Sequence, residues 1–153
     1  MSDIKIGRLG PDSAPELAAL IAAYAQEVHR GAPRRPDEYY ATRILEDEGA
    51  QLLGAWVEGK LIGFAMYFDL VETISGLRCG QIDDFYVYPD YRTLKVARRL
   101  IETLVTEGES RGWAHLRWRI SVKNEAALEL YSDIGEPAPW KSYVIRIDKL
   151  APL

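Results

Sequence analysis

The chain has 153 residues, 48% hydrophobic and 27% charged, so its length and composition are those of a single globular domain and exclude an intrinsically disordered chain. The net charge of −4 argues against nucleic acid as a partner, because a nucleic-acid binder needs a basic face. The lone Cys79 allows neither an intramolecular disulfide nor a cage of thiolates around a metal. No apolar run reaches the length of a membrane span, about 20 residues. We therefore expect a cytoplasmic protein without membrane contact.

The first part of the chain predicts a strand followed by two helices. Residues 4–9 alternate loosely between apolar and polar and favour a short strand. Residues 11–29 carry apolar side chains at helical spacing, with Asp12 or Ser13 as a predicted cap. A stretch rich in glycine and proline ends this helix, and residues 37–48 predict a second, shorter one.

An antiparallel meander is predicted next. Residues 50–72 are two apolar runs around Glu58, Gly59 and Lys60, which is typical of a tight hairpin with the glycine in the turn. Residues 79–88 form another apolar run and predict the next strand. Three strands joined by short connections in this way pair as antiparallel neighbours.

Helices and strands alternate in the last part of the chain. Residues 94–111 place Ala97, Leu100, Ile101, Leu104 and Gly108 on one helical face. The remaining predicted elements are a strand over 114–121, a helix over 124–135 and a last strand over 142–148. The order predicts an α/β (α+β) fold in one domain over 1–153, with a mixed, mostly antiparallel sheet and helices on both faces.

The start of the helix over 94–111 is unusually basic. The sequence VYPDYRTLKVARRL, residues 87–100, puts Arg92, Lys95, Arg98 and Arg99 at this point. A helix N-terminus already carries about half a positive charge, so cations there cost stability unless an anion binds. The pattern indicates an anion site; the alternative is a set of solvated charges, some paired with Glu102.

Two motifs make residues 61–147 resemble the GNAT-superfamily N-acetyltransferases. The first is a strand and loop that cradle the pyrophosphate of acetyl-CoA in that family, matched here by Phe85, Val87, Pro89, Arg92 and Ala97. The second is a helix motif matched by Asn124, Ala127, Tyr131 and Gly135. The resemblance implies the GNAT fold and acetyl-CoA as cosubstrate, which would supply the missing anion.

The resemblance also implies roles for individual residues. Tyr131 becomes the general acid that protonates the departing CoA thiolate. Asn124 becomes either a ligand to the pantetheine arm or the cap of its helix. The acetyl-CoA residues implied in this way are Phe85, Tyr86, Val87, Arg92, Thr93, Leu94, Lys95, Val96, Ala97, Arg98, Asn124 and Ala127. We expect no metal, because His29 and His115 lack the spacing of a metal-binding pair.

Lys95 departs from the family pattern, which has glycine at the centre of the phosphate loop. A glycine lets the backbone approach phosphate closely, so a side chain at this position can crowd the pyrophosphate. The ammonium group of Lys95 can instead supply a charge to the phosphates. The sequence leaves both alternatives open.

An acidic pair lies just before the apolar end of the strand over 79–88. Asp83 and Asp84 precede Phe85 and Tyr86, a pattern that resembles the diamine (spermidine/spermine) acetyltransferase branch. Alternation puts Asp83 on the face of Phe85 and Asp84 on the other. A carboxylate here can attract a protonated amine and help remove its proton, whereas the alternative is a purely structural pair at the strand end.

The expected function is direct transfer of the acetyl group of acetyl-CoA to a primary amine of a small, polyamine-like acceptor. One alternative is a GNAT-fold protein with weakened catalysis that acts as a CoA or polyamine sensor or an interaction domain. Another is an acetyltransferase for protein N-termini or lysines. A homodimer is left open, because Glu136 replaces the family phenylalanine in the tail that would build it.

Overall fold

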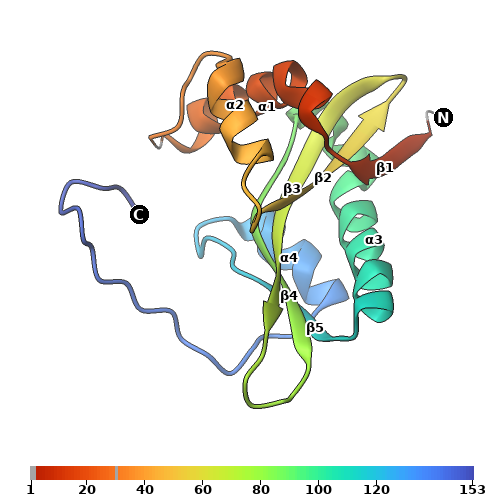
Figure 1. The fold of residues 1–153 in the computed structure, drawn as a ribbon, viewed down its shortest axis with the longest axis vertical. Coiled ribbons are helices and arrows are strands. Elements are labelled where there is room, and N and C mark those ends of the chain that lie inside the picture. Colours follow the sequence, from red (N-terminus) through yellow and green to blue (C-terminus); the bar gives the residue numbers. More distant parts are fainter. Residues whose placement is uncertain (1–2, 30) are drawn as a thin grey trace. The chain divides into compact units, whose positions relative to one another are not determined.

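Five strands form one sheet whose spatial order follows the sequence, β1-β2-β3-β4-β5 (Figure 1). The computed structural model describes residues 3–29 and 31–153. The chain divides into two compact units, the first ending at Trp118 and the second running from Arg119 to Leu153. The strands, all in the first unit, are β1 (Ile4–Arg8), β2 (Gln51–Val57), β3 (Lys60–Val71), β4 (Arg78–Val87) and β5 (Trp113–Trp118).

Strand pairing confirms the predicted mixed sheet. β1 to β4 pair as antiparallel neighbours, and only the β4–β5 pair is parallel. The β2–β3 hairpin turns at Glu58 and Gly59, whose φ angles of 50° and 78° are both left-handed. A two-residue turn of this kind matches the twist of the strands it joins, and glycine adopts the conformation without strain.

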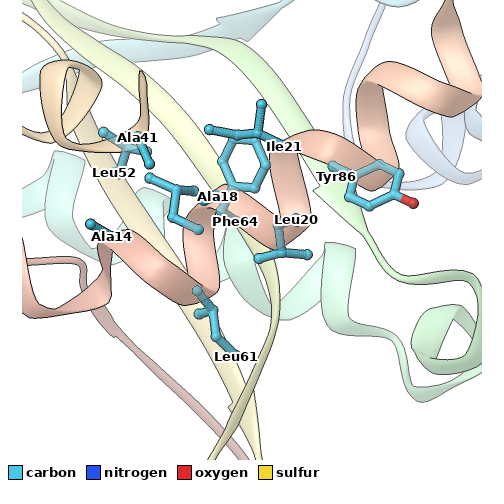
Figure 2. Packing of buried hydrophobic residues seen from close by; sticks show 10 residues of the cluster. Ala14, Ala18, Leu20, Ile21, Ala41, Leu52, Leu61, Phe64 and Tyr86 are labelled. Carbon is cyan, nitrogen blue, oxygen red and sulfur yellow. The ribbon is translucent and has the colours of Figure 1, made fainter. Parts of the chain in front are cut away.

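One face of the sheet is covered by α1 (Ala14–Val28) and α2 (Glu38–Leu45). Asp37 begins α2 by accepting a 3.0 Å hydrogen bond from the N–H of Tyr40. Side chains of α1, α2, β2, β3 and β4 form a common core on this face (Figure 2). The core residues are Ala14, Leu17, Ala18, Leu20, Ile21, Ala41, Leu52, Leu61, Phe64 and Tyr86.

The other face is covered by α3 (Val96–Arg111), which follows a short 3-10 helix, η2 (Pro89–Leu94). The buried residues of α3 are Val96, Leu100, Ile101, Leu104 and Gly108, close to the predicted apolar face. On β3, alternation turns Phe64 toward α1 and Tyr67 toward α3, where its hydroxyl donates to Glu107 over 3.0 Å. Helices therefore flank both faces, as the sequence predicts.

The second unit contains α4 (Glu125–Ile134). Asn124 caps it by accepting a 3.1 Å hydrogen bond from the N–H of Ala127, one of its two predicted roles. The strand predicted over 142–148 is wrong: residues 135–153 form no helix or strand, and Tyr143, Ile145 and Ile147 are exposed. A strand needs a partner for its backbone groups, and alternation alone cannot supply one. A single domain over 1–153 stays a prediction.

Candidate functional site

The second half of β4 extends past the end of β5. The parallel register runs from Arg78 opposite Trp113 to Ile82 opposite Trp118, where β5 ends. Beyond Ile82, residues 84–87 pair with β3 and have no partner on β5. The predicted site residues Phe85, Tyr86 and Val87 all lie in this segment.

Two backbone N–H groups of this segment point away from β3, toward the edge of β4 that lies beyond the end of β5. The N–H of Tyr88 donates to the carbonyl of Ile62 over 2.9 Å and so points toward β3. Successive N–H groups of a strand point to opposite sides, so those of Phe85 and Val87 point away from β3. Two parallel donors of this kind can polarise a carbonyl oxygen placed between them.

The start of α3 offers a second set of donors. The first hydrogen bond within the helix runs from the N–H of Arg99 to the carbonyl of Lys95 over 3.1 Å. The N–H groups of Val96, Ala97 and Arg98 therefore lack an acceptor within the helix. No side chain caps this end and its first turn carries no acidic residue, in the part of the chain that the structure describes. The end is suited to an anion.

Lys95 adopts the backbone conformation that the family glycine would favour. Its φ of 58° and ψ of 32° are left-handed, a region that costs a non-glycine residue about 1 to 2 kcal/mol. Its side chain is exposed. The backbone of the loop thus follows a glycine-like path with a lysine on it, and the lysine stores strain at the point where α3 begins.

Arg92 is held by α1 rather than by the start of α3. Its Nη2 lies 2.9 Å from Oε2 of Glu27, and its Nε donates to the carbonyl of Val87 over 3.0 Å. The guanidinium also lies over the ring of Tyr86, 5.5 Å from the centroid. These contacts tie η2 to α1 and to the end of β4. The predicted phosphate contact of Arg92 stays a prediction.

Tyr24 of α1 meets the acidic pair of β4. Its hydroxyl donates to Oδ1 of Asp84 over 3.0 Å, and its ring stacks on Tyr86 with centroids 5.0 Å apart. Asp84 and Tyr86 therefore face α1. Asp83 sits at a bulge, where the register with β3 shifts between Met66 opposite Asp84 and Tyr67 opposite Ile82. The face predicted for Asp84 agrees with these contacts.

Tyr86 lies in an apolar and acidic setting. Burial raises the pKa of its hydroxyl, and the negative charge of Glu27 raises it further. Burial likewise raises the pKa of Tyr88, with a contribution from Glu16. Both phenols are therefore protonated at neutral pH.

Sequence reasoning missed Tyr24 and Glu27. Tyr24 occupies an apolar position of an amphipathic helix, where a tyrosine is ordinary packing, and its contact with Asp84 spans 60 residues. Glu27 looks like a solvent-facing charge, and its pairing with Arg92 spans 65 residues. No local pattern marks either contact.

The remaining predicted residues lie in η2, in α3 and in the second unit. Thr93 is exposed, Val96 is buried, and Ala97 and Arg98 are partly buried; the side chain of Leu94 lies outside what the structure describes. Tyr131 and Ala127 belong to α4. Burial raises the pKa of the Tyr131 hydroxyl. Its role as the acid stays a prediction.

A search of the described helices for a membrane span found none with the required length and hydropathy.

Comparison with known proteins places these features in a family. A solved ribosomal-protein-alanine N-acetyltransferase from Brucella melitensis biovar Abortus 2308 is 41% identical, with a TM-score of 0.86 and coverage of 95% of this chain and 100% of that chain. An aminoglycoside acetyltransferase from an uncultured soil metagenomic sample shares the fold, with a TM-score of 0.76 and 24% identity. The match covers 95% of this chain and 99% of that chain.

Curated relatives include the thialysine N-epsilon-acetyltransferase of Bos taurus, 26% identical over 104 residues that cover 66% of this chain. The match with the Sus scrofa protein of that name covers 54% of this chain at 25% identity. The chain spans 61% and 51% of the lengths of these relatives. The model of the acetyltransferase (GNAT) family matches residues 16–135. With more than two thirds of its length matched, the chain belongs to the GNAT family of acetyltransferases.

Proposed function

We propose that the protein transfers the acetyl group of acetyl-CoA directly to a primary amine of a small, polyamine-like acceptor. The main support for this proposal is at the end of β4, where the N–H groups of Phe85 and Val87 point away from β3 and no residue of β5 pairs with them. The thioester carbonyl of acetyl-CoA would accept from these donors. Oriented dipoles in a site without water stabilise a developing oxyanion by about 3 to 4 kcal/mol.

The start of α3 would hold the pyrophosphate of CoA. The N–H groups of Val96, Ala97 and Arg98 supply donors and the positive end of the helix dipole. Lys95 adds an exposed cation beside them, and its left-handed backbone keeps the loop on a glycine-like path. These features support a phosphate role for Lys95 and a CoA-binding role for the surrounding η2–α3 segment.

Asp84 is the carboxylate that we assign to the acceptor amine. It faces α1, and the hydroxyl of Tyr24 donates to one of its oxygens over 3.0 Å. An alkyl ammonium has a pKa of about 10.4, so it must lose a proton before its nitrogen can attack. Asp84, directly or through a water molecule, would attract the cation and accept that proton.

Tyr131 is proposed as the acid that protonates the CoA thiolate. This role rests on the second sequence motif and on the raised pKa of its hydroxyl, which keeps the group protonated at neutral pH. Asn124 caps α4 and so fixes the start of the helix that carries Tyr131. No covalent intermediate on the protein is needed, and Cys79 takes no part.

A peptide amine is the second candidate acceptor. The Brucella protein, whose name refers to the alanine of a ribosomal protein, is 41% identical to this chain over nearly its whole length. The curated relatives are named for thialysine, an amino acid with a side-chain amine. The name of the Brucella protein therefore suggests a polypeptide amine as acceptor, whereas the names of the curated relatives suggest a small free amine.

An acceptor panel separates these candidates. The purified chain is incubated with acetyl-CoA and, in separate reactions, with spermidine, thialysine or a peptide that begins with alanine, and the release of free CoA thiol is followed. The proposal predicts the highest kcat/KM with one of the two small amines. A higher kcat/KM for the peptide supports the second candidate. If none of the acceptors causes release of CoA thiol, the sensor or interaction-domain alternative is supported.

A further inference from the structure

A mixed cluster of metal-ligating side chains lies at the other end of β4. Oxygen, sulfur and nitrogen atoms of Glu72, Cys79 and His115 all come within 4.8 Å of one another. The residues come from three neighbouring segments: Glu72 follows β3, Cys79 lies near the start of β4, and His115 lies in β5. All belong to the first unit, so their separation is set by the sheet itself.

An irregularity in the β4–β5 pairing brings His115 to Cys79. Arg78 lies opposite Trp113 and Gly80 lies opposite Leu116, so Ala114 and His115 together face Cys79 alone. An extra residue of this kind bends a strand and re-aims its side chains. On the other side, Cys79 pairs with Leu70 of β3, two residues before Glu72. The N–H of Glu72 donates to the carbonyl of Leu77 over 3.0 Å, which fixes its backbone.

The geometry points to a binding site for one divalent transition-metal ion of the Zn²⁺ type, held by Glu72, Cys79 and His115. Thiolate, imidazole and carboxylate are the ligands that Zn²⁺ takes, with water in a fourth position. Two ligands about 2.0 to 2.1 Å from a tetrahedral ion lie roughly 3.3 Å apart. Nε2 of His115 and Oε2 of Glu72 lie 3.1 Å apart as an ion pair, and this separation is also close to that edge.

Access to the cluster is from the side of the histidine. The His115 side chain is 46% exposed and that of Glu72 is 25% exposed, whereas Cys79 is fully buried. An ion would reach the thiol through the two outer ligands. Val87 lies eight positions after Cys79, or about 26 Å along a strand, so the site is distinct from the proposed acyl-transfer site. The ion would clamp β3, β4 and β5 together at this end of the sheet.

Co²⁺ is the probe that tests the site, because a cysteine sulfur bound to Co²⁺ gives a charge-transfer absorption band in the near ultraviolet. The full chain, prepared without a polyhistidine tag and stripped of metal, is titrated with CoCl₂. The inference predicts a band that saturates at one equivalent and is displaced by Zn²⁺. Absence of the band overturns the inference.

The variants exploit the fact that the chain has two histidines and one cysteine. His115→Asn and Glu72→Gln alter exposed or partly exposed side chains and should weaken Co²⁺ binding at least tenfold. Cys79→Ala should abolish the band. The matched control is His29→Asn, which alters the other histidine, at the exposed end of α1, and should bind as the unchanged chain does. Equal affinities of His115→Asn and His29→Asn overturn the inference.

Thermal unfolding gives a second readout that does not require the Cys79 variant to fold. A ligand that binds only the native chain raises the unfolding midpoint. ZnCl₂ should raise the midpoint of the unchanged chain and of His29→Asn and leave that of His115→Asn in place. A rise of the same size in all three contradicts the site.

Discussion

At the scale of single residues, Lys95 combines a cost with a proposed gain. Its left-handed backbone costs a lysine about 1 to 2 kcal/mol, and the residue is the N-cap of α3, where CoA phosphates are proposed to bind. Strain of this kind persists when the surrounding structure over-determines it and often marks functional sites. Substitution of Lys95 by alanine and by glycine separates the effect of its charge from the effect of its backbone strain.

Lys95→Ala removes the charge and keeps the strained Cβ. We predict that CoA binds about 1 to 3 kcal/mol more weakly, or about 5- to 150-fold, because a hydrogen bond to a charged group is lost. Calorimetric titration of CoA at two salt concentrations measures the change, and the difference between variant and unchanged chain should shrink at high salt. Pantetheine, which lacks the pyrophosphate, should lose much less affinity and serves as the control ligand.

Lys95→Gly should weaken CoA to a similar degree and, unlike Lys95→Ala, raise the midpoint of thermal unfolding. The relief of strain exceeds the added entropy of the unfolded chain by roughly 0.5 to 1 kcal/mol. If Lys95→Gly binds CoA more tightly than the unchanged chain, Lys95 obstructs the site and its phosphate role is wrong.

Asp84→Asn tests which member of the acidic pair serves the amine. Because Asp84 faces Tyr24 of α1, we predict that its neutralisation raises the KM for the acceptor and flattens the rise of rate with pH, while the KM for acetyl-CoA changes little. Asp83→Asn, the same change one residue away at the bulge, is the matched control. Steady-state kinetics of both variants decide the assignment, and an effect confined to Asp83→Asn reverses it.

Tyr131→Phe removes only the hydroxyl. We predict a fall in kcat of roughly ten- to a thousandfold with CoA affinity unchanged, if thiolate protonation limits turnover. Burial raises the pKa of this phenol above its ordinary value near 10, so the acid is present below pH 10 and lost only as the pH rises through the raised value. The pH profile of kcat should therefore show no loss from this group below pH 10. Unchanged kcat removes Tyr131 from the mechanism.

At the scale of elements, α3 packs closely on β5 through a glycine. A Cβ on Gly108 would lie 2.5 Å from Cε3 of Trp113, and the indole of Trp113 also crowds Gly80 of β4. The indole Nε1 donates to Asp69 over 2.9 Å, so the ring is held in place. The close approach packs the start of β5 between α3 and β4.

Gly108→Ala should destabilise the chain although alanine is the better helix former. Alanine gains about 1 kcal/mol in a helix, whereas overpacking against a fixed ring costs about 1 to 3 kcal/mol. We expect a lower midpoint of thermal unfolding, by about 2 to 4 °C for each net kcal/mol. Glu109→Ala, at the exposed neighbouring position, is the control and should leave the midpoint nearly unchanged. A higher midpoint in Gly108→Ala would show that Trp113 can move.

The elements that sequence reasoning predicted correctly share a local cause. The β2–β3 hairpin follows from two apolar runs around Gly59, and α3 follows from its 3.6-residue apolar period. The strand over 142–148 had the right alternation, but strand formation depends on a partner that lies elsewhere in the chain. Local pattern was therefore sufficient for helices and hairpins and insufficient for the tail.

The candidate site was predictable only where it coincided with a motif. The strand end at Phe85 to Val87 is proposed through the family resemblance, and the start of α3 is proposed from its basic residues together with that resemblance. Tyr24, which meets Asp84 across 60 residues, was not found, because helical spacing made it look like core. Sequence spacing relates His115 only to His29, whereas its neighbours in space are Glu72 and Cys79. Contacts between distant segments are set by sheet register, which no local pattern encodes.

At the scale of the whole molecule, the two ends of β4 have different proposed roles. Val87 and the start of α3 would hold acetyl-CoA, and the opposite end of the strand would bind a metal ion. If both hold, loss of the metal site through His115→Asn should lower the unfolding midpoint in Zn²⁺ and leave the KM for acetyl-CoA unchanged.

The central claim is that the acetyl group passes directly from acetyl-CoA to a free amine. The most direct measurement follows acetyl-CoA carrying a ¹³C-labelled acetyl group in the presence of spermidine, with mass spectrometry of the amine and of the intact protein and a thiol assay for CoA. Direct transfer predicts labelled acetyl-amine and free CoA in equal amounts, with no labelled acetyl group on the protein. Labelled acetyl on Cys79, or no labelled product with spermidine or with the other acceptors of the panel, would contradict it.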